Sequence, residues 1–211
     1  MKYIFFDLDG TLVDSSKGIK NAFRYAFEKL NLKSPEDPIL NTFIGPPLET
    51  SFSSILVDDK KVDKAISEFR YYYREKGVFE VKLYSQITDM LNMMRDKGYQ
   101  LYITTSKNET MTYKMLEYLN IKTYFNSIFG ALPDSYHKAD VLKRAIKESK
   151  AKLNEAIIIG DTSFDMIGGK QVGIATLGVV WGFGKNEDLL KNGADKLAIK
   201  PLEILKILQG L

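Results

Sequence analysis

The chain has no cysteine and only one histidine, His137, among its 211 residues. The absence of cysteine excludes disulfides, thiolate nucleophiles and cysteine-ligated zinc. A single histidine excludes sites that need two, such as the H-E-x-x-H arrangement of metalloproteases. Long apolar runs are also missing, because no stretch approaches the roughly 20 residues that a helix needs to cross a bilayer. We therefore expect no membrane partner.

Charge of one sign is not in large excess. The chain carries 30 Lys and Arg residues against 27 Asp and Glu residues, which gives a formal net charge of +3. This balance does not argue for a nucleic acid polymer as partner, but it is compatible with a small anionic substrate. Met1 and Lys2 lead directly into a short apolar run without a secretory signal pattern, so we expect a cytoplasmic location.

Apolar strand patterns alternate with helical patterns over most of the chain. This alternation predicts an α/β fold with a parallel sheet, in which ligands bind at the carboxyl ends of the strands. Strands are expected at 2–6, 100–104, 127–131, 156–160, 174–181 and 196–199. Helices are expected at 86–97, 109–119, 138–149, 164–171, 186–192 and 201–209.

Residues 15–82 have helical spacing and no strand pattern. Helices are expected at 16–32, at 60–76 and after the Gly45-Pro46-Pro47 turn, with a polar break at 31–38.

We therefore predict two domains. A Rossmann-like parallel-sheet core is formed by residues 1–14 and 83–211, and an all-helical cap is inserted at 15–82. An insertion at this point leaves the sheet beside the predicted site, where it can act as a lid.

The strongest chemical signal is the stretch Phe6-Asp7-Leu8-Asp9-Gly10, in which an apolar strand delivers two acids into a glycine turn. Alternate residues of a strand point the same way, so the carboxylates of Asp7 and Asp9 can converge. Converging carboxylates at the end of a buried strand are costly unless a cation or a substrate uses them. The alternative is a solvated turn that happens to be acidic.

A second pair of acids, Asp161 and Asp165, follows the apolar strand expected at 156–160. Together with Asp7 and Asp9, these residues would make an oxygen-rich site that suits Mg²⁺. The alternative for Asp161 is that it caps the next helix, a position that Asp favours. The presence of the first acidic pair favours metal binding.

Two further residues follow strands at positions that suit a phosphate. Thr104 could donate its hydroxyl to a phosphoryl oxygen, or it could be an ordinary turn residue. Lys138 begins an amphipathic helix and could balance several carboxylates and a phosphate, although a lysine at such a position is usually solvated. His137 is interpreted as a surface residue or as a support for the site.

These segments resemble the motifs of the haloacid dehalogenase superfamily of phosphatases. Asp7–Asp14 is similar to the first motif, Thr104 to the second, Lys138 to the third and Gly160–Asp165 to the fourth. The order and spacing match over essentially the whole chain. The insertion between the first and second motifs has the size of the helical C1-type cap of one branch.

The C-terminal part narrows the resemblance to the phosphoglycolate phosphatase-like group. The segments that carry it are Gly178–Gly184, Gly193-Ala194-Asp195 and Pro201-Leu202-Glu203. Some positions depart from the usual pattern, because Thr105 replaces an asparagine, Ala139 replaces a proline, and Ser85-Gln86 replaces Pro-Gly. None of these departures removes a catalytic group, but they weaken any transfer of substrate identity.

The resemblance implies a mechanism. Asp7 would attack phosphorus and form an aspartyl-phosphate, and Asp9 would protonate the leaving alkoxide and then deprotonate the attacking water. Mg²⁺ would be held by Asp7, the backbone carbonyl of Asp9, Asp161 and, directly or through water, Asp165.

The remaining site residues would hold the substrate. Thr104 and Lys138 would bind the phosphoryl oxygens, and backbone amides around Leu8 and Thr105 could add donors. The turn at Gly10 would let the backbone approach closely. Glu49 could contact a polar substrate tail, or it could simply occupy the first turn of a helix, where acids are favoured.

The expected function is that of a Mg²⁺-dependent phosphomonoesterase acting on a small organic phosphate, phosphoglycolate-like or a nucleotide, as a monomer or homodimer. The alternatives are a phosphomutase of the same superfamily, a phospho-accepting signalling module and a catalytically idle Mg²⁺-binding protein. A receiver module needs neither the acid at Asp9 nor a helical cap, which argues against the signalling alternative.

Overall fold

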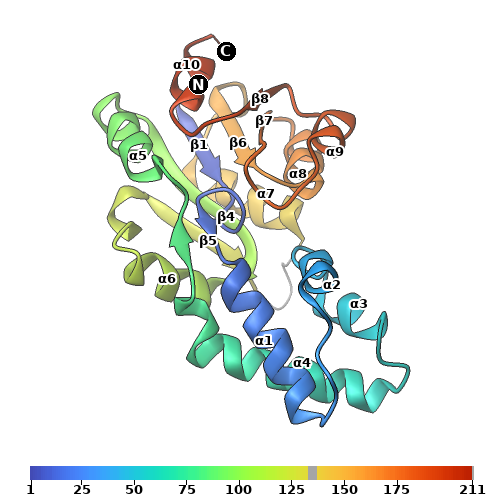
Figure 1. Ribbon diagram of the computed structural model, residues 1–211. Coiled ribbons are helices and arrows are strands. Elements are labelled where there is room, and N and C mark those ends of the chain that lie inside the picture. The colour runs from blue at the N-terminus through green and yellow to red at the C-terminus, as the bar shows by residue number, and fades with distance from the viewer. Residues whose placement is uncertain (133–136, 211) are drawn as a thin grey trace. The chain divides into compact units, whose positions relative to one another are not determined.

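The computed structural model describes residues 1–132 and 137–210 (Figure 1). The chain divides into two compact units. The first unit consists of Met1–Asp14 and Lys82–Leu211, and the second consists of Ser15–Val81. Among the described residues, no helix combines the length and the apolar character that a membrane crossing requires.

The first unit is built on a six-stranded sheet in the order β5-β4-β1-β6-β7-β8, and all neighbouring strands are parallel. The strands are β1 (Tyr3–Phe6), β4 (Gln100–Asn108), β5 (Ser127–Ala131), β6 (Ala156–Gly160), β7 (Ala175–Val179) and β8 (Lys196–Ala198). The sheet confirms the predicted α/β fold. Because β1 lies between β4 and β6, the residues that follow these three strands meet at one edge.

Helices surround this sheet, and they explain why its strands are almost uniformly apolar. They are α5 (Ile87–Asp96), α6 (Glu109–Tyr118), α7 (Lys138–Ser149), α8 (Ser163–Val172), α9 (Asn186–Lys191) and α10 (Glu203–Gln209), with 3₁₀ turns at Lys122–Tyr124 and Leu153–Glu155. On one face, Phe5 and Tyr102 belong to the same core cluster as Val141 of α7. Ile4 and Phe6 point to the opposite face and are equally buried. A strand that is buried on both faces reads as a continuous apolar run.

A two-stranded antiparallel ribbon, β2 (Val13–Asp14) with β3 (Lys82–Leu83), belongs to the first unit as well. The sequence pattern does not predict this ribbon. Two residues per strand are too few to produce an alternating pattern.

The second unit contains α1 (Ser16–Lys29), α2 (Asp37–Thr42), α3 (Leu48–Ser53), α4 (Asp59–Glu75) and a 3₁₀ turn at Gly77–Phe79. Its core is aromatic: the ring of Phe23 lies 4.7–5.0 Å from the rings of Phe43, Phe52 and Phe69. The short helix α2 starts within the segment that we expected to be a polar break. Only Leu40 of α2 is buried, so the helix has almost no apolar periodicity to reveal it.

Candidate active site

Asp7 follows the central strand β1 directly. Its N–H donates to the carbonyl of Ile159 over 2.8 Å, which extends the parallel ladder by one residue. The next turn closes on the carbonyl of Leu8, which accepts from the N–H groups of Thr11, Leu12 and Val13 at 3.0–3.3 Å. This compact turn fixes the backbone on the C-terminal side of Asp7.

Gly10 lets this turn approach Asp161. Its φ of +81° lies in the left-handed region that glycine favours. A Cβ atom at this position would lie 2.1 Å from Oδ2 of Asp161, so any side chain would displace the acid. Both the backbone conformation and the close packing against Asp161 therefore require glycine at this position of the first motif.

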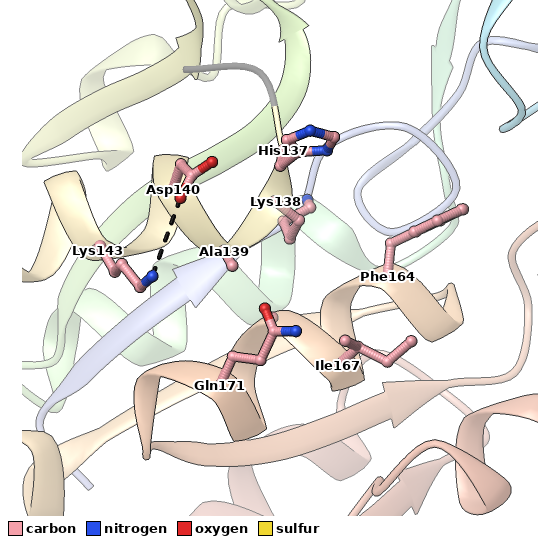
Figure 2. Close-up of a pocket in the computed structure, with 9 residues that line it drawn as sticks. His137, Lys138, Ala139, Asp140, Lys143, Phe164, Ile167 and Gln171 are labelled. Atoms are coloured by element: carbon pink, nitrogen blue, oxygen red, sulfur yellow. Dashed lines mark ion pairs between the residues drawn. The ribbon is translucent and has the colours of Figure 1, made fainter. Parts of the chain in front are cut away.

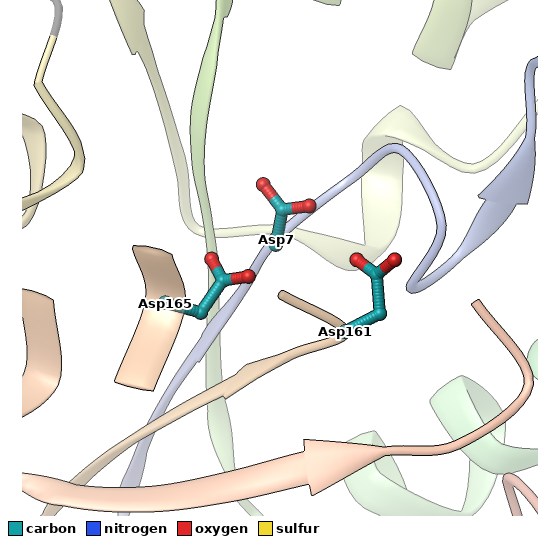
Figure 3. A group of neighbouring side chains, drawn as sticks. All are labelled: Asp7, Asp161 and Asp165. Carbon is teal, nitrogen blue, oxygen red and sulfur yellow. The ribbon is translucent and has the colours of Figure 1, made fainter. Parts of the chain in front are cut away.

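Three acids, Asp7, Asp161 and Asp165, form a buried cluster, with one ligand oxygen from each within 4.8 Å of the others (Figure 3). They come from three places in the fold. Asp7 follows β1, Asp161 follows β6, and Asp165 lies in the first turn of α8. The cluster therefore joins the first and fourth motifs at the carboxyl ends of adjacent strands.

Hydrogen bonds hold the two acids of the fourth motif in place. Asp161 accepts from the hydroxyl of Thr11 at Oδ1 (3.1 Å) and from the N–H of Phe183 at Oδ2 (2.7 Å). Oδ2 of Asp165 accepts from the N–H (3.1 Å) and the hydroxyl (2.8 Å) of Thr162, the N-cap residue of α8. The helix is therefore capped by Thr162 and not by Asp161, which leaves Asp161 directed at the cluster.

Lys138 is buried among these acids. Its Nζ lies 2.5 Å from Oδ1 of Asp7 and 2.8 Å from Oδ1 of Asp165, and it donates to the carbonyl of Thr104 over 2.9 Å. Burial acts to lower the pKa of Lys138, but the carboxylates of Asp165 and Asp7 outweigh it and raise this pKa above its ordinary value. The lysine is thus a charged member of the cluster.

The acids themselves are held in an unfavourable environment. Burial raises the pKa of Asp7 well above its ordinary value; Asp165 and Asp161 raise it further, while Lys138 opposes the shift. Burial and the charge of Asp165 raise the pKa of Asp161 to about 7, against the hydrogen bonds from Phe183 and Thr11. If all three acids were ionised beside one ammonium, the cluster would carry excess negative charge, which a bound cation would neutralise.

Asp9 lies beside this cluster without joining it. Its Oδ2 is 3.1 Å from Nζ of Lys107, and its Oδ1 is buried without a hydrogen-bond partner in the described part of the chain. The predicted role of Asp9 as a metal ligand involves its backbone carbonyl, and it stays a prediction.

The two threonines that end the apolar part of β4 are buried. Thr104 is fully buried, and its hydroxyl has no hydrogen-bond partner among the residues described. The hydroxyl of Thr105 accepts from the N–H of Lys107 over 3.2 Å. Thr104 therefore has a free donor at the same edge of the sheet as Asp7.

Two other residues singled out in the sequence are exposed. Glu49 occupies the first turn of α3 in the second unit, where it is exposed and 3.7 Å from Arg70. Its contact with a substrate stays a prediction. His137 is the exposed N-cap residue of α7, one position before Lys138.

A pocket of about 320 Å³ lies between α7 and α8 (Figure 2). Its lining residues are His137, Lys138, Ala139, Asp140, Lys143, Phe164, Ile167, Gly168 and Gln171. The Asp140 and Lys143 side chains are paired across 3.9 Å at its rim.

A family model described as "Haloacid dehalogenase-like hydrolase" matches residues 4–179. The chain belongs to this family. A haloacid dehalogenase-like family hydrolase from Streptococcus pneumoniae has a similar structure, with a TM-score of 0.94, 44% identity and 99% of each chain covered. A 5′-nucleotidase from Pseudomonas aeruginosa is 29% identical over 189 residues, or 88% of this chain and 86% of the relative. A phosphoglycolate phosphatase from Aquifex aeolicus is 29% identical over 214 residues, which cover 100% of this chain and 98% of the relative.

This haloacid dehalogenase-like hydrolase is therefore an enzyme of the phosphatase type. Phosphatases of the family generally use Mg²⁺, and the cluster provides a suitable donor set. Carboxylate oxygens are hard ligands of the kind that Mg²⁺ prefers, and the excess negative charge of three buried acids calls for a cation. The residues present fit the ion.

The contact of Lys107 with Asp9 is not predicted by the sequence pattern. We expected the strand to end at 104, but β4 continues to Asn108 past a register shift in its pairing with β5. Polar residues follow Thr104 without apolar alternation, so no pattern predicted that Lys107 would return to the site.

Proposed function

We propose that this hydrolase is a Mg²⁺-dependent phosphomonoesterase that acts through an aspartyl-phosphate on Asp7. The observation that carries this proposal is the buried cluster of Asp7, Asp161 and Asp165 around the ammonium of Lys138. A buried carboxylate at the end of the central strand, beside a lysine and a cation site, suits a nucleophile that attacks an anionic phosphate.

In the first half of the reaction, a carboxylate oxygen of Asp7 attacks phosphorus. The bond from phosphorus to the leaving oxygen breaks, and the carboxylic acid of Asp9 gives its proton to that oxygen. Lys138 and the hydroxyl of Thr104 would hold the non-bridging oxygens, where negative charge must be stabilised; the unpartnered hydroxyl of Thr104 supports this role. The alcohol then leaves, and Asp7 carries the phosphoryl group.

In the second half, Asp9 is a carboxylate and accepts a proton from water. The water oxygen bonds to phosphorus, the bond between Asp7 and phosphorus breaks, and inorganic phosphate leaves. Asp7, Asp161, Asp165 and the carbonyl of Asp9 would hold Mg²⁺, which when bound offsets the repulsion between the nucleophile and the phosphate. Asp9 thus ends each cycle protonated, as it began.

The substrate class is a small organic phosphate. Relatives named 5′-nucleotidase and phosphoglycolate phosphatase support both substrates that the sequence suggested, and they do not favour one. We propose that the second unit, Ser15–Val81, selects the substrate as a helical cap. Phosphate release from a panel of nucleotides, sugar phosphates and phosphoglycolate would rank these classes.

The nucleophile is tested by Asp7→Asn. The substitution replaces the attacking oxygen by an amide while Lys138 keeps its contact with Asp165, so the protein should fold with an unchanged melting temperature or a higher one. Phosphate release should fall by at least about 10³-fold, because loss of a nucleophile removes the covalent route. Asp96→Asn, at the exposed end of α5, is the matched control and should keep full activity. Substantial Mg²⁺-dependent turnover by the Asp7 variant would refute the proposal.

A further inference from the structure

The ammonium of Lys107 contacts the carboxyl group of Asp9, and no sequence motif predicts this contact. Nζ of Lys107 lies 3.1 Å from Oδ2 of Asp9, and both side chains are largely shielded, with 10% of Lys107 and 21% of Asp9 exposed. Oδ1 of Asp9 is buried without a hydrogen-bond partner within residues 1–132 and 137–210. The two oxygens of the carboxyl group therefore differ, because one is anchored and the other is not.

The backbone around Lys107 is firmly built. β4 pairs with β5 at Thr104 and again at Asn108, and the register shifts between these two points. Between these two points, the N–H of Lys107 donates to the hydroxyl of Thr105 over 3.2 Å. The side chain of Asn108 then caps α6 by accepting from the N–H of Met111 over 3.3 Å. Along this irregular part of β4, the side chain of Lys107 reaches the carboxyl group of Asp9.

We propose that Lys107 is a positioning residue that holds Asp9 in the orientation needed for proton transfer. This inference rests on the function proposed above. Lys107 fixes Oδ2, so that Oδ1 is the oxygen that gives the proton to the leaving group and later takes one from water. Each proton moves between Oδ1 and a substrate or water oxygen, and Lys107 neither gains nor loses one.

Orientation of this kind matters because proton transfer depends steeply on distance. A carboxyl group attached by a short side chain can rotate about two bonds, and a misplacement of about 1 Å can cost about 10²-fold in rate. An anchor on Oδ2 limits that rotation. Loss of Lys107 should therefore weaken the steps that need Asp9 and spare the step that does not.

The test compares phenyl phosphate with 4-nitrophenyl phosphate in Lys107→Met. The two esters differ only by the para nitro group, but phenolate is a poorer leaving group than nitrophenolate and depends more on the proton from Asp9. Because kcat/KM reports the steps up to formation of the aspartyl-phosphate, it isolates the acid step. We expect kcat/KM to fall about tenfold for phenyl phosphate and less than about threefold for 4-nitrophenyl phosphate.

Four further variants complete the test. Lys107→Arg keeps the cation and should recover much of the kcat/KM that Lys107→Met loses on phenyl phosphate. Lys107→Met combined with Asp9→Asn should lose no more than Asp9→Asn alone, because both changes act on the same group. Lys122→Met, which removes an exposed lysine paired with Glu117, is the control and should change neither ester.

Equal losses on both esters would overturn the inference, because they would indicate a purely structural role for Lys107. A rise in KM with unchanged kcat would also overturn it, since Lys107 would then bind substrate directly. If Lys107→Met does not fold, the arginine variant and the melting temperatures decide between these outcomes. Failure of the unmodified enzyme to release phosphate from either ester would instead refute the proposed function, and the inference with it.

Discussion

Thr104 is a buried residue whose hydroxyl has no hydrogen-bond partner among the described residues. A buried polar group without a partner costs about 1–3 kcal/mol, so such a group usually has a use. The carbonyl of the same residue accepts from Lys138, whose ammonium also contacts Asp7. We infer that the stability lost here is recovered when a phosphoryl oxygen accepts the hydrogen bond.

Thr104→Val should separate stability from activity. Valine has nearly the same shape, so the free energy of unfolding should stay the same or rise by up to about 1 kcal/mol, because an unsatisfied hydroxyl is removed. Phosphatase activity should fall by about 10²-fold, because a donor to the transition state is lost. Thr104→Ser should keep most of the activity. Urea denaturation and phosphate-release assays measure the two effects.

The matched control is Thr112→Val in α6. Thr112 is equally buried, but its hydroxyl donates to the carbonyl of Asn108 over 3.0 Å. This variant should lose about 1 kcal/mol of stability and keep its activity. If Thr104→Val instead behaved like Thr112→Val, the hydroxyl of Thr104 would have no role in the site.

Some residues of the site could be predicted from the local sequence pattern, and others could not. Asp7 and Asp161 each follow an apolar strand, and Lys138 begins an amphipathic helix. The parallel topology brings such positions to one edge of the sheet. The contact of Lys107 with Asp9 depends on the register shift in β4. Tertiary packing sets this shift, and no local pattern in the sequence predicts it. Single-sequence reasoning could propose the cluster, but it could not propose the partner of Asp9.

At the scale of elements, the loop after β7 encloses Asp161. Phe183 donates its N–H to the acid, and the indole N–H of Trp181 donates to the carbonyl of Thr11 over 3.0 Å. A Cβ atom at Gly182 would lie 2.3 Å from Cβ of Asp161 and 2.4 Å from the carbonyl oxygen of Gly10. The loop therefore contacts both Asp161 and the turn after Asp9, and the close packing requires glycine at position 182.

Gly182→Ala should disrupt this packing. Neither contact is with the far end of a flexible side chain, so the loop or the acid must move, at a cost of about 1–3 kcal/mol in stability. Displacement of Asp161 should also raise the Mg²⁺ concentration needed for half-maximal activity. Chemical denaturation followed by the fluorescence of Trp181, the only tryptophan of the chain, measures the stability.

Gly210→Ala provides the control for this change. The nearest atom to its Cβ would be the carbonyl oxygen of Ile207 at 3.7 Å, an ordinary contact. Stability and Mg²⁺ dependence should both be unaffected. An alanine at 182 that left the Mg²⁺ dependence untouched would show that the loop does not position Asp161.

Elements with a strong apolar pattern could be predicted from the sequence, and those without one could not. The strands expected at 127–131 and 156–160 match β5 and β6 residue for residue. The helix α2 and the ribbon of β2 and β3 were missed, because α2 buries one residue and each ribbon strand has two. Tertiary contacts stabilise these elements, and such contacts cannot be predicted from the local sequence pattern.

At the scale of the whole molecule, the acid cluster links stability to pH. The pKa of Asp161 is raised from an ordinary value of 3.8 to about 7 in the folded protein, and that of Asp7 is also raised. Between these values the folded state binds more protons than the unfolded state. Without metal, the free energy of unfolding should therefore fall as the pH rises from about 4 to about 7, as far as these two acids determine it.

Mg²⁺ should reverse this trend, because it binds the carboxylates in place of their protons. At about pH 5 the ion must displace protons from Asp161 and Asp7, whereas at about pH 8 it binds acids that are already ionised. The rise in melting temperature on adding MgCl₂ should therefore be larger at the higher pH. Differential scanning calorimetry at both pH values, with and without the salt, measures this difference. Asp161→Asn should lose most of the rise, and Asp96→Asn should keep it; a pH-independent rise in the unmodified protein would place the ion away from these acids.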